Sequence, residues 1–185
     1  RGQKEIIESI LAGKHTLGIL PTGSGKSLCY QLPTYLIEKP TLVISPLISL
    51  MDDQVMQMKL NGESHVSYIH SGMDEIEKRN HINQISQSRF IYLSPEFLLQ
   101  PQNFKLISHL DFGLIVLDEA HCLSEWGYDF RPHYALIGQI TSHFKNARIL
   151  ALTATAPPHL EEDLSHILSI DLNVIKTSMN RDNIS

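Results

Sequence analysis

Short apolar runs alternate along this chain with longer segments in which apolar residues recur at helical spacing. The short runs have the length of buried β-strands, and the longer segments have the period of helices with one apolar face. We predict strands at 16–20, 41–44, 65–69, 90–93, 114–117, 149–152 and, with a weaker pattern, 173–175. We predict helices at 47–60, 74–86, 133–144 and 158–168. This alternation is typical of an α/β fold, in which helices flank both faces of a parallel sheet.

The composition narrows the classes of protein that fit. With 185 residues and 42% hydrophobic content, the chain suffices for one well-buried core, so we expect a single domain. The formal net charge of −5 argues against a broad basic face, so any contact with nucleic acid must be local. Two cysteines, Cys29 and Cys122, provide neither a disulfide framework nor a zinc site, and the ten histidines show no pairing pattern. We therefore expect no zinc.

Neither a membrane span nor a signal peptide is predicted, because no apolar run is long enough and no charged-then-apolar start is present. We expect a soluble protein, cytoplasmic and nucleoid-associated if bacterial, nuclear if eukaryotic. Helical spacing is already established at Ile6 and Ile10, and the sequence stops at Ser185 without a capping pattern. Both ends therefore look like cuts in a longer chain.

Polar and small residues follow most of the predicted strands. Open parallel sheets bind their ligands beyond the carboxyl ends of the strands, so these positions are where sites are expected. The segments concerned are 21–27, 45–50, 94–96, 118–121 and 153–156.

The first of these segments has the features of a phosphate-binding loop between a strand and a helix, with the sequence Pro21-Thr22-Gly23-Ser24-Gly25-Lys26-Ser27. Its glycines let backbone N–H groups surround phosphates, Lys26 reaches the β and γ oxygens, and Ser27 binds Mg²⁺. Leu20 stands where the general pattern has its first glycine. An ordinary glycine-rich turn is the alternative interpretation.

Two carboxylates directly follow the apolar run 114–117, and two adjacent charges at the end of a buried strand indicate a functional role. Asp118 is predicted to hold Mg²⁺, and Glu119 to orient or deprotonate the water that attacks the γ-phosphate. The alternative is a solvated acidic turn. A phosphate-binding loop upstream, in the right order, favours catalysis, so the two motifs together predict ATP hydrolysis.

The box Asp118-Glu119-Ala120-His121, with the loop before it and the segment LTATA at 152–156 after it, resembles the ordered signature of superfamily 2 helicases. A phosphate-binding loop that begins Pro-Thr-Gly is common there. Three further segments are similar to those of the RecQ family: SPLISLMDDQV at 45–55, YLSPE at 92–96 and CLSEWGYDFRPHY at 122–134. The resemblance extends over essentially the whole chain.

This resemblance implies a RecA-like P-loop NTPase domain, the ATP-binding domain of a DNA helicase, over residues 1–185. It implies 3′ to 5′ translocation on single-stranded DNA and duplex unwinding in DNA repair and recombination, with ATP and Mg²⁺ as cofactors. The second RecA-like domain, the zinc module and the winged-helix domain lie outside the chain. Expected partners are single-stranded DNA, 3′-tailed duplex DNA and, through the absent domains, single-strand DNA-binding protein. We expect a monomer.

The resemblance also assigns residues to contact with DNA: Ser45, Pro46, Leu47, Ser49, Ser94, Pro95, Trp126, Phe130, Arg131 and Tyr134. Stacking of a base on an aromatic side chain contributes about 1 to 3 kcal/mol of binding free energy, so the loop containing Trp126 is expected to bind a single strand in place of a basic surface. A core position is the alternative for Phe130 and Tyr134. His121, Thr153 and Thr155 are assigned to coupling between the two sites, with turn formation before Pro157 as the alternative for the two threonines.

Gln3 occupies the position of the family glutamine that hydrogen-bonds adenine. The arginine and aromatic residue expected before it lie outside the chain, so adenine affinity is expected to be weak. An arginine finger from the second domain is typically worth about 10³ to 10⁵ in rate, so the isolated chain is expected to bind nucleotide and hydrolyse it barely.

Three other classes of protein compete with this interpretation. An RNA helicase has the same Asp-Glu-Ala-His box, but the aromatic segment argues against it. A P-loop kinase or GTPase leaves that box and the segment 152–156 without a purpose. A catalytically silent binding module is disfavoured because Lys26, Ser27, Asp118 and Glu119 are all intact.

Overall fold

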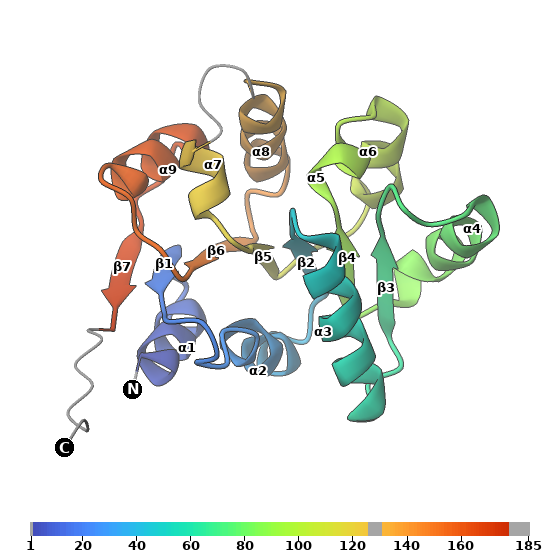
Figure 1. Ribbon diagram of the computed structural model, residues 1–185, viewed down its shortest axis with the longest axis horizontal. Helices are drawn as coiled ribbons and strands as arrows, with labels where there is room; N and C mark the ends of the chain where they lie inside the picture. Colours follow the sequence, from blue (N-terminus) through green and yellow to red (C-terminus); the bar gives the residue numbers. More distant parts are fainter. Residues whose placement is uncertain (1, 126–130, 178–185) are drawn as a thin grey trace.

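The computed structural model describes residues 2–125 and 131–177, without the side chains of 124–125 and 131–135. In this part of the chain seven parallel strands form one sheet, in the order β3-β4-β2-β5-β6-β1-β7 (Figure 1). The strands are β1 (Thr16–Ile19), β2 (Thr41–Ile44), β3 (Val66–Ile69), β4 (Phe90–Leu93), β5 (Leu114–Leu117), β6 (Arg148–Thr153) and β7 (Asn173–Lys176).

Helices cover both faces of the sheet (Figure 1). One face packs against α1 (Gln3–Leu11), α2 (Leu28–Ile37) and α3 (Ile48–Leu60). The other packs against α4 (Glu75–Gln84), the 3-10 turn η1 (Ile85–Gln87), α5 (Pro95–Leu98), α6 (Pro101–Ile107), α7 (His121–Glu125), α8 (Arg131–His143) and α9 (Leu160–Leu168). No helix in the described ranges is both long and apolar enough to cross a membrane.

The central strands are apolar throughout because both of their faces are buried. In β4, Phe90 and Tyr92 join the core beneath α1 to α3, whereas Ile91 and Leu93 join the core beneath the other helices. All four side chains are fully buried. Successive side chains of a strand point to opposite faces, so a strand between two helical layers needs an unbroken apolar run.

The predicted α/β class and parallel sheet are confirmed, and all seven predicted strands are present. The predicted helix at 74–86 ends at Gln84 and continues as the 3-10 turn η1. The short helices α5, α6 and α7 were not predicted. Helices of four to seven residues hold too few turns for apolar periodicity to show in the sequence.

Candidate nucleotide-binding site

The predicted phosphate-binding loop lies between β1 and α2, at the carboxyl edge of the sheet. Gly23 and Gly25 have φ angles of 76° and 73°, in the left-handed region that favours glycine. Nothing lies within 4 Å of the place where a Cβ would stand at Gly23. At Gly25 a Cβ would lie 2.7 Å from Nε2 of Gln3, so that side of the loop is already filled.

Gln3 supports this loop from α1. Its amide nitrogen donates to the carbonyl of Ser24 at 2.6 Å and to that of Gly25 at 3.1 Å. Helices α1 and α2 pack against each other, which places the start of α1 beside the loop that precedes α2. The structure therefore joins Gln3 to the backbone of the loop, and its predicted contact with adenine stays a prediction.

Lys26 and Glu119 contact each other at the carboxyl edge of the sheet. Nζ of Lys26 lies 2.8 Å from Oε1 of Glu119, and the two side chains are only 15% and 13% exposed. They follow β1 and β5, which are not neighbours, because β6 lies between them. The predicted loop and carboxylate motifs thus converge at one place although 93 positions separate Lys26 from Glu119.

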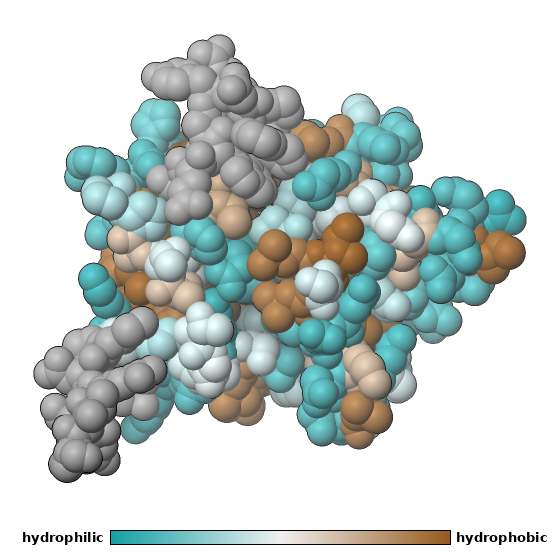
Figure 2. Space-filling model, in the orientation of Figure 1, coloured by the Kyte–Doolittle hydropathy of each residue, from teal (hydrophilic) through white to brown (hydrophobic). Residues whose placement is uncertain are grey.

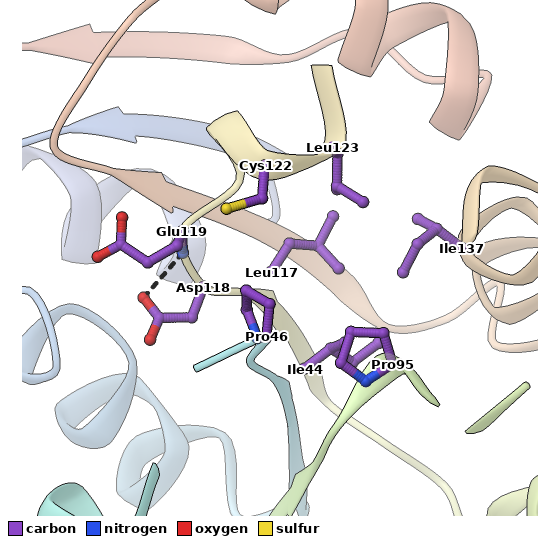
Figure 3. Close-up of a pocket in the computed structure, with 9 residues that line it drawn as sticks. All are labelled: Ile44, Pro46, Pro95, Leu117, Asp118, Glu119, Cys122, Leu123 and Ile137. Atoms are coloured by element: carbon purple, nitrogen blue, oxygen red, sulfur yellow. Dashed lines mark hydrogen bonds between the residues drawn. The ribbon is translucent and has the colours of Figure 1, made fainter. Parts of the chain in front are cut away.

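Asp118 is the more deeply buried of the two carboxylates, with 5% exposure. Oδ1 accepts a hydrogen bond from the backbone N–H of Glu119 at 3.1 Å (Figure 3), whereas Oδ2 is buried without a hydrogen-bond partner. Burial, followed by the charge of Glu119, raises the pKa of Asp118, and the Lys26 ammonium opposes that effect. A buried carboxylate oxygen without a donor fits a site for a hydrated cation.

The backbone of Glu119 is in the left-handed region, with a φ of 49°. Few non-glycine residues adopt this conformation, and such outliers cluster at functional sites. The turn redirects the chain after β5, so that Asp118 and Glu119 both lie at the strand end but contact different groups.

The three predicted coupling residues are brought together behind Glu119. Nδ1 of His121 lies 2.9 Å from Oγ1 of Thr153 and 3.3 Å from Oε2 of Glu119. The Thr153 hydroxyl also donates to the carbonyl of Thr155 at 2.8 Å and accepts from its N–H at 3.2 Å. Because Thr153 ends β6, this chain of contacts joins the carboxylate to the strand between β1 and β5.

A mainly apolar pocket lies beside the two carboxylates (Figure 3). Its wall comes from several strand ends and from α7 and α8, and consists of Ile44, Pro46, Pro95, Leu117, Asp118, Glu119, Cys122, Leu123 and Ile137. Pro46 and Pro95 belong to the two segments predicted to contact DNA. Residues of both segments therefore line the same pocket as Asp118 and Glu119.

The residues predicted to contact DNA differ in exposure. Leu47 and Ser49 are exposed and Pro46 is half-buried, and Figure 2 shows apolar surface gathered where β2 meets α3. The buried set is Ser45, Ser94 and Pro95, of which Ser94 accepts from the N–H of Phe97 at 3.3 Å and caps α5. Trp126, Phe130 and the side chains of Arg131 and Tyr134 lie outside the described residues. In this conformation Leu47 and Ser49 are the accessible members of the described set.

Sequence reasoning missed two polar side chains near this site, Tyr30 of α2 and Gln54 of α3. The Tyr30 hydroxyl donates to Oε1 of Gln54 at 2.7 Å. A tyrosine in a largely apolar helix signals a buried hydroxyl that needs a partner. Nothing in the spacing of the chain identifies a glutamine 24 positions away as that partner.

The family model described as DEAD/DEAH box helicase matches residues 1–163. The chain therefore belongs to the DEAD/DEAH box helicase family. Within that family its relatives include RecQ and RecS helicases, which confirms the resemblance that the sequence motifs indicated.

Several relatives match the chain over its whole length, among them two bacterial helicases. It is 45% identical to the probable ATP-dependent DNA helicase RecS of Bacillus subtilis and covers 38% of that protein. It is 43% identical to the ATP-dependent DNA helicase RecQ of Pasteurella multocida and covers 29% of it. The chain thus spans about a third of the length of these relatives. A putative ATP-dependent RNA helicase of a mimivirus is 39% identical over 98% of the chain, which covers 34% of that protein.

Solved helicase structures share the fold. The helicase Lhr of Mycobacterium smegmatis, bound to single-stranded DNA and AMP-PNP, superposes with a TM-score of 0.74 at 19% identity, over 96% of this chain and 25% of that one. A hypothetical ATP-dependent RNA helicase from Sulfolobus tokodaii gives 0.74 at 22% identity, over 95% and 51%. At such identities the likeness concerns the fold alone.

Proposed function

We propose that this chain is the ATP-binding half of a DNA-dependent motor, the first RecA-like domain of an ATP-dependent DNA helicase of the RecQ type. The observation that carries the proposal is the 2.8 Å contact between Lys26 and Glu119, which brings the phosphate-binding loop and the carboxylate box into one site. The RecQ and RecS relatives are named as ATP-dependent DNA helicases, which supports the same activity.

The residues present fit ATP and Mg²⁺. The two left-handed glycines shape a loop whose backbone N–H groups can surround phosphates, and Lys26 supplies a positive charge. Ser27 and Asp118 would hold Mg²⁺, and Oδ2 of Asp118 is a buried acceptor without a donor. When bound, Mg²⁺ would neutralise the charge that develops on the phosphate oxygens. Gln3 would read the adenine edge from its place against the loop.

Glu119 would act as the group that orients the attacking water and accepts its proton. To do so it must exchange its contact with Lys26 for one with water, while Lys26 turns to the phosphates. His121 contacts the same carboxylate through Oε2 and is itself held by Thr153. These contacts keep the side chain of Glu119 directed at the loop.

The accessible residues Leu47 and Ser49, together with the aromatic segment that contains Trp126, Phe130, Arg131 and Tyr134, would hold a single strand. Ser45, Pro46, Ser94 and Pro95 would support that surface from beneath, next to the carboxylates. We propose translocation from 3′ to 5′ on single-stranded DNA and unwinding of 3′-tailed duplexes in repair and recombination. Single-strand DNA-binding protein would be recruited through domains outside this chain, and the protein would act as a monomer.

The test is ATP hydrolysis by the full-length protein with single-stranded DNA, with single-stranded RNA and with neither, and with Lys26→Ala as the blank. We expect stimulation by DNA that the blank lacks. Equal or greater stimulation by RNA would overturn the DNA assignment and favour an RNA helicase, the activity in the name of the mimivirus relative. Hydrolysis that persists in the blank would contradict the ATP site itself.

A further inference from the structure

Two oxygen atoms at the carboxyl edge of the sheet are buried without a hydrogen-bond partner among the described residues, Oγ of Ser45 and Oδ2 of Asp118. The two residues are only 1% and 5% exposed. A buried polar group is costly unless it is hydrogen-bonded, so each of these atoms requires a partner. The proposed cation supplies one for Asp118. Burial in this conformation keeps the Ser45 hydroxyl away from a strand bound at the surface, so its partner must be another group.

Ser45 and Asp118 directly follow two neighbouring strands of the sheet. In the parallel pair of β2 and β5, Ile44 lies opposite Leu117. The ladder continues past this pair, because the N–H of Asp118 donates to the carbonyl of Ile44 at 2.9 Å. Adjacent strands lie about 4.8 Å apart, so Ser45 and Asp118 are next to each other across the sheet.

The side chains of these two residues lie on the same face of the sheet. Ile44 and Leu117 join the core beneath α4 to α9, and Pro46 lines the pocket on that side together with them. Successive side chains point to opposite faces, so Ser45, between Ile44 and Pro46, faces the layer of α1 to α3. Figure 3 shows the carboxylate of Asp118 turned away from Leu117, toward that same layer.

This face also carries the end of the phosphate-binding loop. Helix α2 begins directly after Ser27, and its Cys29 and Tyr30 share a buried cluster with Val116 of β5. Ser27 is the other residue proposed to hold Mg²⁺. The Ser45 hydroxyl therefore lies on the side of the sheet where the ion is proposed to bind.

The chemistry of the two oxygens limits what can join them. They are not hydrogen-bonded to each other, and an ionised carboxylate can only accept hydrogen bonds. Mg²⁺ usually keeps several of its waters when a protein binds it through one or two carboxylates. A water on the ion directs its lone pair at the metal and offers two protons. One proton suits Oδ2 of Asp118 and the other suits Oγ of Ser45.

We propose that Ser45 is a positioning residue for the cation site, where its hydroxyl accepts a hydrogen bond from an ion-bound water that also donates to Asp118. Ser45 acts on the ion through this water and does not touch ATP. The two serines of the segment 45–50 thus have different ligands, the ion's water for Ser45 and the strand for exposed Ser49. The inference rests on the proposed function, because it requires a Mg²⁺-dependent ATP site.

The experiment uses the full-length protein and compares Ser45→Ala with Ser45→Thr, which keeps the hydroxyl, and with Ser49→Ala. Three quantities are measured: the Kd for Mn²⁺ in the presence of ADP, from the electron paramagnetic resonance signal of the free ion, the Kd for ADP in EDTA, and the Kd for single-stranded DNA. For Ser45→Ala we expect Mn²⁺ binding to weaken about tenfold while the other two constants stay at their wild-type values. Ser49→Ala should weaken DNA binding and leave the Kd for Mn²⁺ unchanged.

A purely structural role for Ser45 predicts a different pattern. Its hydroxyl has no partner among the described residues, so Ser45→Ala in EDTA should melt at the wild-type temperature or slightly above it. Ser45→Thr should retain the wild-type Kd for Mn²⁺. The proposal would be overturned by unchanged Mn²⁺ binding or a lower melting temperature in Ser45→Ala, by an equal loss of Mn²⁺ binding in Ser45→Thr, or by a loss of DNA binding alone. A wild-type protein that binds no Mn²⁺ with ADP would instead contradict the proposed function.

Discussion

At the scale of single residues, Lys26 serves two partners. It forms an ion pair with Glu119 at 2.8 Å and is proposed to bind the phosphates of ATP. In that proposal the two partners compete for one ammonium group, so the ion pair is expected to weaken nucleotide binding. The residue proposed to activate water is thus also expected to limit nucleotide affinity.

Glu119→Gln in the full-length protein removes one side of that competition. We expect tighter ATP binding together with a fall in kcat of about 10²-fold or more, because a general base is lost. The Kd for a fluorescent ATP analogue and the steady-state rate are the two measurements. Glu161→Gln, at an exposed position at the start of α9, is the matched control. Weaker ATP binding in Glu119→Gln would show that the ion pair does not compete.

His15 is expected to make the free energy of unfolding depend on pH. Its Nδ1 accepts the backbone N–H of Ile149 at 3.0 Å, an interaction that a protonated ring cannot make. Burial, and secondarily the charge of Arg148, lowers the pKa of His15 from its ordinary 6.5. The unfolded chain therefore takes up this proton first as the pH falls, and stability is lost between 6.5 and the lowered pKa.

Urea unfolding of wild type and His15→Gln, at about pH 7.5 and about pH 5.5, measures this effect. We expect the free energy of unfolding to fall more steeply with acid in wild type than in the variant. Equal slopes would mean that other groups, such as His81, carry the dependence.

At the scale of elements, β1 and α1 approach each other closely at Gly18. A Cβ there would lie 2.6 Å from Cδ1 of Ile6 and 2.9 Å from Cδ2 of Leu152, and both side chains are fully buried. The close approach seats α1 on the sheet. It thereby sets the position of Gln3 against the phosphate-binding loop.

Gly18→Ala should lower the free energy of unfolding by about 1–3 kcal/mol, because it overpacks a filled core. Gly138→Ala, in α8, provides the matched comparison, since the nearest atom to a Cβ there is 3.5 Å away. That change should be neutral or stabilising by up to about 1 kcal/mol, because alanine suits a helix better than glycine. Denaturant unfolding of both variants decides the question, and equal stabilities would contradict the packing argument.

Prediction from sequence succeeded for the elements with a strong pattern. Strands such as β5 are unbroken apolar runs between polar segments, and long helices such as α3 show their period. The short helix α5 was missed because its four residues hold too few turns to show a period, even though Ser94 before Pro95 is a helix-start signal. Its boundaries come from a tertiary environment in which Ser94 and Pro95 are buried.

Sequence patterns likewise predicted only part of the candidate site. Lys26, Asp118 and Glu119 were found because they belong to contiguous motifs at strand ends, where a parallel sheet gathers them. The link from Tyr30 to Gln54 was missed because it joins two helices through side chains without a fixed spacing. Motifs of residues that are close together in the sequence can be predicted from it, whereas contacts between two helices depend on how the helices pack.

At the scale of the whole molecule, the proposed motor needs a second RecA-like domain to complete the ATP site. We expect the isolated chain to bind ATP and hydrolyse it at a rate about 10³- to 10⁵-fold below that of the full-length protein, since the arginine finger is supplied from outside. A thermal shift with Mg-ATP, absent in Lys26→Ala, would report binding. Turnover by the fragment at the full-length rate would contradict this expectation.

The left-handed conformation of Glu119 carries backbone strain at the residue proposed to activate water, so stability and the proposed activity place opposite demands on this position. Glu119→Ala and Glu119→Gly both remove the carboxylate, but only glycine relieves a backbone conformation that costs other residues about 1–2 kcal/mol. The glycine variant should therefore melt at a higher temperature than the alanine variant, and equal melting temperatures would contradict the strain. A selection for heat-resistant variants of this domain would accordingly favour glycine over alanine here, and would enrich proteins that fold well and no longer hydrolyse ATP.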